Sequence, residues 1–137
     1  MPKTWTQKLS GGKAPHVVTL EKAFAGVPVG ARLLIASPLL LDRTIAAIPR
    51  GSVQDVPVLR QQLARQHGAD ATCPVSTAIF LRIVAEAALE RLGQGVPMSA
   101  ITPFWRVIAQ RTTLSAKLSC GDDFISLQRE MEAAVPD

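Results

Sequence analysis

The stretch Thr102-Pro103-Phe104-Trp105-Arg106-Val107-Ile108 decides how we interpret the fold. It places two of the few aromatic residues side by side, behind a proline and before an arginine. A β-branched pair then leads into a polar turn over residues 110–113, and β-branched residues favour strands. We therefore predict a β-hairpin in which residues 104–109 pair with residues 114–118.

Length and composition indicate one folded domain. The chain has 137 residues, of which 47% are hydrophobic and 19% charged, and this is typical of a globular protein. The longest apolar run, residues 33–41, is too short to span a bilayer, and residues 1–5 lack the apolar core of a signal peptide. We expect a cytoplasmic monomer that needs no membrane and no cofactor.

The cysteines and histidines give no sign of a metal site. Cys73 and Cys120 have no CxxC partner, and His16 and His67 are too scattered to complete a ligand set with them. In a reducing compartment, two free thiols are the expected state. We predict no metal centre.

Charge is unevenly distributed along the chain. Residues 1–120 carry 14 basic and 6 acidic side chains, whereas residues 121–137 carry 1 basic and 5 acidic ones. A basic body with an acidic end is compatible with binding to a polyanion such as nucleic acid. Alternatively, these charges serve only to keep the protein soluble.

Hydrophobic spacing predicts four helices after an N-terminal extension. We assign residues 1–36 to a partly ordered extension, with short strands near residues 17–18 and 32–35, and residues 37–134 to the main domain. The predicted helices cover residues 37–48, 57–66, 76–92 and 122–134. For the third of these we expect an exposed line of Arg82, Glu86 and Glu90, and for the last a buried face. That buried face consists of Phe124, Leu127 and Met131.

The order of these elements is that of a winged helix-turn-helix. Two helices, a turn and a longer helix are followed by the predicted hairpin, which would be the wing. The fold class predicted from the sequence is therefore mainly α with a small β-hairpin.

Two segments resemble a known family. Ile48-Pro49-Arg50-Gly51-Ser52-Val53 and Ile101-Thr102-Pro103-Phe104-Trp105-Arg106-Val107-Ile108 are similar to motifs in the DNA-binding domain of the O6-alkylguanine-DNA alkyltransferases. The resemblance covers residues 37–132 and includes a helix that begins near Pro74. It implies a winged helix-turn-helix that binds double-stranded DNA in DNA repair.

Departures from this family pattern exclude its chemistry. The family's nucleophilic cysteine aligns with Phe104 and its proton-relay histidine with Trp105, and neither side chain can accept an alkyl group. The family's base-flipping tyrosine aligns with Val56, and its intercalating arginine with Ala78 or Ile79. The chain thus resembles the non-catalytic alkyltransferase-like proteins, which bind alkylated DNA without repairing it.

Candidate site residues follow from this resemblance. The residues placed at a base pocket are Phe104, Trp105, Arg106, Ser119 and Cys120. The candidates for DNA contact are Arg50, Ser52, Gln54, Ser76, Thr77, Arg82 and Arg111, with Lys117 beside them on the predicted hairpin.

Three interpretations stay open at this point. The two rings of Phe104 and Trp105 either stack on a flipped base or fill the core. The fold either binds DNA, with or without recognition of a modified base, or serves protein interaction or small-molecule binding. The third interpretation is that the thiol of Cys120 accepts an alkyl group in place of the family's cysteine, although Asp122 and Asp123 beside it would raise its pKa.

Overall fold

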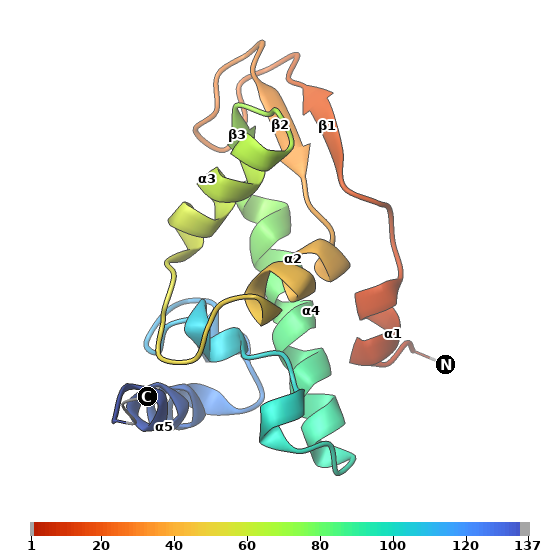
Figure 1. The fold of residues 1–137 in the computed structure, drawn as a ribbon. Helices are drawn as coiled ribbons and strands as arrows, with labels where there is room; N and C mark the ends of the chain where they lie inside the picture. Colours follow the sequence, from red (N-terminus) through yellow and green to blue (C-terminus); the bar gives the residue numbers. More distant parts are fainter. Residues whose placement is uncertain (1, 135–137) are drawn as a thin grey trace.

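The computed structural model describes residues 2–134, which form five α-helices and one three-stranded sheet (Figure 1). The fold is therefore mixed α/β. The helices are α1 (Trp5–Ser10), α2 (Pro38–Ala46), α3 (Val56–Gln66), α4 (Pro74–Gly93) and α5 (Gly121–Ala134). The strands are β1 (His16–Thr19), β2 (Arg32–Ile35) and β3 (Ala71–Thr72). Three short 3-10 turns complete the fold: η1 (Met98–Ala100), η2 (Phe104–Arg106) and η3 (Ser115–Lys117).

The sheet joins the N-terminal segment to the helices. β2 is the central strand and pairs antiparallel with β1 and parallel with β3. Leu33 and Leu34 of β2 are buried. The strands predicted at residues 17–18 and 32–35 are confirmed. The sheet thus spans the boundary that we placed between residues 36 and 37.

The helices α2 and α3 begin as their sequences predict. The hydroxyl of Ser37 accepts the backbone N–H of Leu40 at 3.1 Å, and Pro38 occupies the first turn of α2. This combination starts a helix because the serine hydroxyl accepts one of the unpaired N-terminal N–H groups, and proline, which has no N–H, leaves one fewer donor to satisfy. Leu59 and Leu63 of α3 are fully buried, so the predicted inner face of this helix is confirmed.

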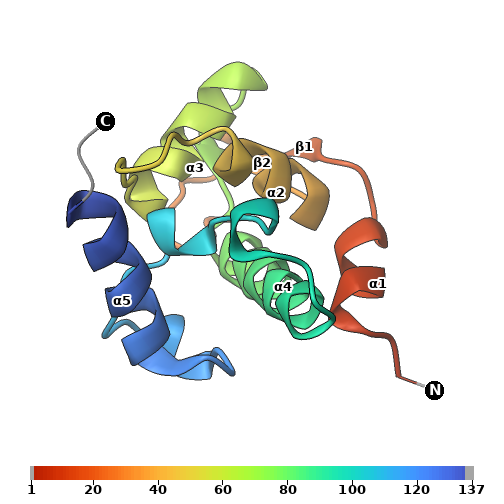
Figure 2. The ribbon, with the colours of Figure 1, turned by 60° about the horizontal axis from the view of Figure 1, so that its bottom comes forward.

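The long helix α4 runs through the middle of the molecule, with α1 on one side and α5 on the other (Figure 2). Its carboxylates do not form the exposed line predicted from the sequence. Glu86 is buried and accepts the backbone N–H of Ser119 at 3.1 Å. Glu90 accepts the N–H groups of Trp5 and Thr6 at 3.2 and 3.1 Å, at the start of α1.

The docking of α1 on α4 explains why the prediction of an exposed line was wrong. A carboxylate stabilises the unpaired N–H groups of a helix N-terminus. The hydrogen bond from the Thr6 hydroxyl, together with these backbone bonds, holds the pKa of Glu90 below its usual value. On the same helix, the guanidinium of Arg82 lies 5.4 Å from the ring centre of Trp5. The helix α1 therefore covers a polar face of α4 that we had predicted, from the sequence of α4, to be exposed to solvent.

The predicted hairpin over residues 104–118 was wrong. Residues 104–106 and 115–117 form the turns η2 and η3 instead of paired strands. Phe104 and Trp105 are both buried, whereas consecutive residues of a strand point to opposite faces. A single helical turn allows both rings to point inward. The second turn is fixed by Thr112 and Ser115, each of whose side chains accepts the other's backbone N–H.

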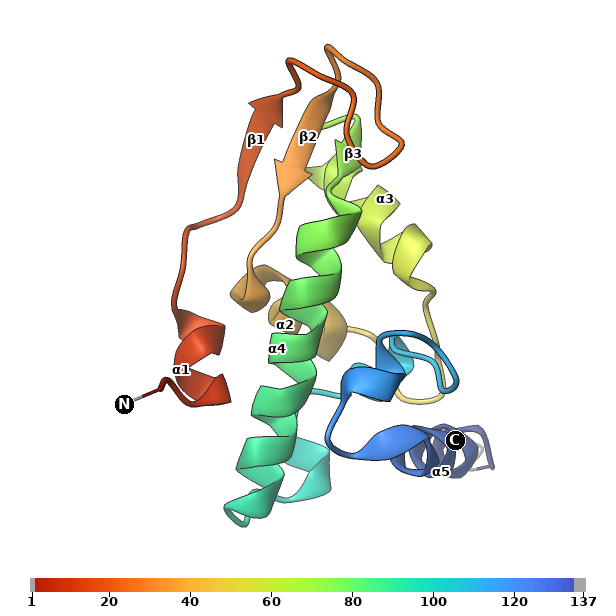
Figure 3. The same ribbon diagram turned by 180° about the vertical axis from the view of Figure 1, so that it is seen from behind.

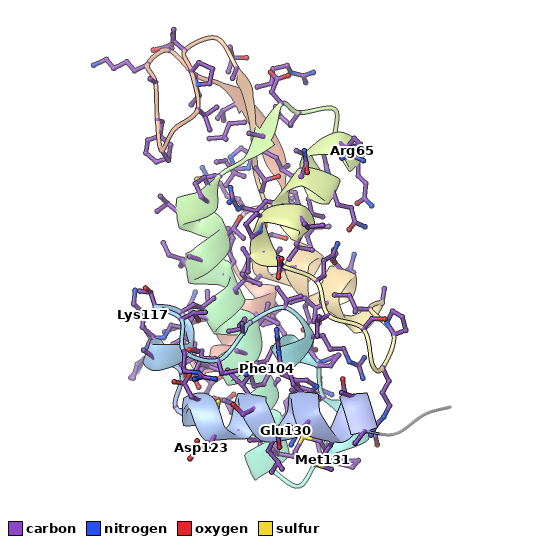
Figure 4. All side chains as sticks on the ribbon, turned by 90° about the vertical axis from the view of Figure 1, so that its left-hand side faces the viewer. Arg65, Phe104, Lys117, Asp123, Glu130 and Met131 are labelled. Atoms are coloured by element: carbon purple, nitrogen blue, oxygen red, sulfur yellow. The ribbon has the colours of Figure 1, made fainter. Side chains whose placement is uncertain are left out.

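The buried face of α5 was predicted only in part. Phe124 packs against the core, as predicted. Ile125, Gln128 and Glu132 are buried. Leu127 and Met131 are about half exposed, and Met131 lies on the outer side of α5 with Asp123 and Glu130 (Figure 4). Glu132 is held inward by polar partners, which rotate the helix away from the orientation that its apolar residues favour. No helix within residues 2–134 is long and apolar enough to cross a membrane.

Candidate functional site

Phe104 and Trp105 lie in the core, together with Phe124 of α5. Their exposed fractions are 0% and 3%. The ring of Phe104 stacks on Phe124 with centres 5.8 Å apart, and it meets Trp105 edge to face at 5.3 Å. Both geometries are favourable for aromatic pairs. Figure 4 shows Phe104 in the interior, behind α5. In this structure, the two rings are core residues and do not form an open stacking platform.

Glu132 binds both residues that follow Phe104. The indole N–H of Trp105 donates to Oε2 of Glu132 at 2.9 Å. Arg106 donates Nε–H to Oε1 and Nη2–H to Oε2, each at 2.9 Å, and its Nη1–H donates to the carbonyl of Ile48 at 2.7 Å. A bidentate pair of this kind is among the stronger hydrogen-bonded arrangements. The arginine therefore has a structural role that ties η2 to α5 and to the end of α2.

The charge state of Glu132 follows from this arrangement. Burial raises the pKa of its carboxyl, but the hydrogen bonds from Arg106 and Trp105 and the positive charge of Arg106 outweigh burial and leave the pKa below its usual value. Sequence reasoning missed Glu132. The signal was present, because Glu132 lies seven residues after Ile125, on the helical face that Ile125 and Gln128 share.

Ser119 is held by the carboxylate of Glu86, and Cys120 by the hydrophobic core. The backbone N–H and hydroxyl of Ser119 both donate to the carboxylate of Glu86. Cys120 packs against the hydrophobic core. Burial raises the pKa of its thiol, and the negative charges of Glu86 and Asp122 raise it further. A thiol with a raised pKa is a poor nucleophile at neutral pH.

We expect Cys120 to react with iodoacetamide at pH 7 at least about tenfold more slowly than free cysteine does, because little of its thiol is present as thiolate. Mass spectrometry of the folded protein over time measures this rate. Incubation with a duplex that contains O6-methylguanine should likewise leave the mass of the protein unchanged. A methyl adduct on Cys120 would contradict the account and would support a displaced acceptor.

The candidate DNA contacts fall on three separate parts of the fold. Arg50, Ser52 and Gln54 lie between α2 and α3, where the N–H of Gln54 donates to the carbonyl of Arg106 at 2.8 Å. Arg111 is exposed, and its backbone N–H donates to Asp122 at 3.0 Å. The remaining three are on α4: Ser76, Thr77 and Arg82.

The three candidates on α4 differ in accessibility. Thr77 is fully buried and donates its hydroxyl to the carbonyl of Cys73 at 2.6 Å. The hydroxyl oxygen of Ser76 is also buried, without a partner within the described residues. Neither is presented to a ligand in this structure. Arg82 is half-buried: its Nε is buried without a partner among the described residues, and its guanidinium lies over the ring of Trp5.

Arg82 lines a groove along α4. The helix α1 lies on one side of α4 and the segment that contains η3 on the other (Figure 3). We call this groove the α4 groove, and its volume is about 420 Å³. Its floor is apolar, and its described lining includes three cations and no carboxylate. The lining residues are Trp5, Lys8, Ala78, Ile79, Arg82, Ile83, Thr113, Leu114 and Lys117. Figure 4 shows Lys117 directed outward at one flank. Lys8 was not among the predicted site residues, because it lies in residues 1–36, which we assigned to a partly ordered extension.

A second cavity lies where η1, η2 and α5 meet, with a volume of about 440 Å³. We call it the η2 pocket. Its lining includes Trp105 and Arg106 from the predicted base pocket and Arg50 from the predicted DNA contacts. Its other lining residues come from the end of α2, residues 98–103 and α5. It shares no lining residue with the α4 groove.

Comparison of the chain with models of known protein families, with curated proteins and with solved structures found no match. Within residues 2–134, no group of three or more histidine, cysteine, aspartate or glutamate side chains is arranged to hold a metal ion. The function therefore has to be inferred from the groove, the pocket and the family resemblance.

Proposed function

We propose that this protein is a non-catalytic, alkyltransferase-like DNA-binding domain in which α3 and α4 form the helix-turn-helix and the α4 groove faces duplex DNA. The observation that carries the proposal is the charge of this groove. Lys8, Arg82 and Lys117 line it, and neither of the α4 carboxylates, Glu86 or Glu90, is among its lining residues.

The shape of the α4 groove supports contact with the two strands of a duplex. Lys8 comes from α1 and Lys117 from η3, so the two cations stand on opposite flanks of α4. Ala78 and Ile79 lie between them, and Ile79 is 56% exposed. Cations bind phosphates without regard to sequence, and small apolar side chains contact the thymine methyl group in the major groove. We therefore expect binding dominated by phosphate contacts, with little sequence preference.

Salt dependence tests this proposal. With three phosphate contacts, the logarithm of the association constant for a labelled duplex should fall with the logarithm of salt concentration with a slope of about −2.7. Replacing both flanking lysines, Lys8→Gln with Lys117→Gln, should reduce the magnitude of the slope by about 2. Fluorescence anisotropy between about 50 and 200 mM salt measures both slopes.

The matched control carries the same change in charge elsewhere. Lys22→Gln with Arg65→Gln also removes two cations, both from exposed positions outside the α4 groove. This variant should keep the wild-type slope. Equal loss of affinity in the two double variants would show only a general effect of net charge and would overturn the assignment of the α4 groove.

Recognition of an alkylated base through Phe104 and Trp105 is not part of this proposal, because both rings are core residues. Duplexes with and without O6-methylguanine should bind with affinities equal within about twofold, since stacking on an aromatic platform would contribute about 1–3 kcal/mol per base. A preference of tenfold or more for the modified duplex would show that the rings become accessible to a flipped base.

Protein binding is the second candidate function, and one observation favours it. Val58 on α3 and Val75 and Ile79 on α4 are each about half exposed or more, and exposed apolar side chains gather at protein interfaces. Absence of DNA binding at low salt, with retention of the fold, would favour this alternative. A duplex-dependent anisotropy change that is lost on replacement of the flanking lysines would count against it.

A further inference from the structure

The η2 pocket contains polar groups that the fold leaves unused. Gln128 is only 7% exposed and lines the pocket, yet its side-chain amide makes no hydrogen bond within residues 2–134. The amide nitrogen and oxygen of Gln128 are not among the described side-chain atoms that are both fully buried and without a partner, so they are accessible from the pocket and free to bind a ligand. The backbone N–H of Ile101, another lining residue, likewise has no acceptor among the described residues.

One cation of this pocket is also free. Within residues 2–134, the single Lys or Arg side chain in an ion pair is Arg106, which binds Glu132. Arg50 lines the same pocket, and no described carboxylate pairs with it. The charges of Arg106 and Glu132 cancel, so the positive charge offered to a ligand comes from Arg50. A single free guanidinium matches a group with one negative charge.

Part of the pocket lining is apolar. Met98 and Met131 line the pocket together with Pro103 and Trp105, and Ser99 and Thr102 add polar groups. Methionine side chains adapt to flat or irregular partners and make favourable contacts with aromatic rings. A volume of about 440 Å³ is in the range of pockets that hold small molecules. The pocket therefore combines an apolar body site with donors for an anionic oxygen.

We propose that the η2 pocket binds a small aromatic monocarboxylate, with Arg50 and the amide of Gln128 contacting the carboxylate and the methionines contacting the ring. A carboxylate is favoured over a phosphate because a dianion would require a second free cation. This site is independent of the DNA-binding proposal, since it shares no residue with the α4 groove.

A pair of probes of nearly equal shape tests the site. Benzoate and benzyl alcohol differ in charge but have similar size, and their binding is followed by NMR through the side-chain amide of Gln128 and the indole N–H of Trp105. We expect benzoate to shift both resonances in a saturable manner and benzyl alcohol to bind at least about tenfold more weakly, because it lacks the charge-assisted bond.

Variants assign the contacts. Arg50→Gln should weaken benzoate binding about tenfold or more, as expected from loss of a hydrogen bond to a charged group. Gln128→Leu should also weaken it while keeping the side chain's volume. Arg43→Gln is the control, because Arg43 is exposed on α2 and does not line this pocket.

The outcomes that would overturn the proposal are distinct. Unchanged resonances up to the solubility limit of benzoate would mean that water alone satisfies the pocket. Equal binding of the two probes would remove the role of Arg50, and equal effects of Arg43→Gln and Arg50→Gln would show unspecific attraction. Since Arg50 is exposed, its replacement should leave the fold intact, and the backbone NMR spectrum verifies this.

Discussion

Glu132→Gln is expected to destabilise the protein by about 3 kcal/mol. The substitution removes the charge that compensates Arg106 while leaving Arg106 largely buried, and breaking one side of a buried ion pair costs about 3–5 kcal/mol. The lower end applies because a glutamine still accepts one of the hydrogen bonds that Trp105 and Arg106 now donate. Urea unfolding of both proteins at pH 7 measures the difference.

The matched control is Glu130→Gln on the same helix. Glu130 is exposed on the outer side of α5 (Figure 4), so its replacement should change the free energy of unfolding by less than about 0.5 kcal/mol. Equal destabilisation by the two variants would show that Glu132 acts only through the charge or helix propensity of α5.

The effect of Glu132 should also depend on pH. Because its pKa is lower in the folded protein than in the unfolded chain, its contribution is fully present above the unfolded value of about 4.3. It is lost as pH falls through the lower folded value. The difference in unfolding free energy between wild type and Glu132→Gln should thus stay constant from pH 7 to about pH 5 and then shrink on further acidification.

Phe104→Ala is expected to cost about 3–5 kcal/mol, because it leaves a cavity where a fully buried ring packs on Trp105 and Phe124. Thermal and urea unfolding measure the loss. Phe24→Ala provides the control, since Phe24 is largely exposed and should contribute less than about 1 kcal/mol.

The same variant separates a core role from a binding role for Phe104. Below its unfolding temperature, Phe104→Ala should bind duplex DNA with nearly wild-type affinity, because Phe104 lies outside the α4 groove. A loss of DNA affinity in a variant that remains as stable as wild type would contradict the core assignment.

The sequence predicted those parts of the fold that depend on local signals. Ser37-Pro38 marks the start of α2 through capping that involves adjacent residues only, and the spacing of Leu59 and Leu63 identifies the inner face of α3. The short strands near residues 17–18 and 32–35 were likewise found from their apolar residues and flanking breakers.

Features that depend on distant partners could not be predicted in this way. The buried face of α5 is set by Glu132, whose partners Trp105 and Arg106 lie more than twenty residues earlier. The polar face of α4 is covered by α1, because Glu90 binds backbone N–H groups that no side-chain pattern reveals. In both cases, a carboxylate that a sequence pattern would place in solvent instead holds two parts of the fold together.

The candidate site was predicted in part. Arg82 and Lys117 meet in the α4 groove, although the predicted hairpin that carried Lys117 is a pair of 3-10 turns. Trp105, Arg106 and Arg50 meet at the η2 pocket. Gln128 was not predicted there. The sequence does not show which way the side chain of a glutamine in an amphipathic helix faces until the packing of that helix is known.

The two tryptophans allow the most direct test of the central claim, since Trp5 lines the α4 groove and Trp105 lies in the core. Their indole N–H resonances, assigned with a Trp5→Phe variant, are followed by NMR while a short duplex is added at about 50 mM salt. The account predicts that the Trp5 resonance shifts with DNA concentration while the Trp105 resonance stays in place. A shift of the Trp105 resonance alone, or no shift of either, would contradict it.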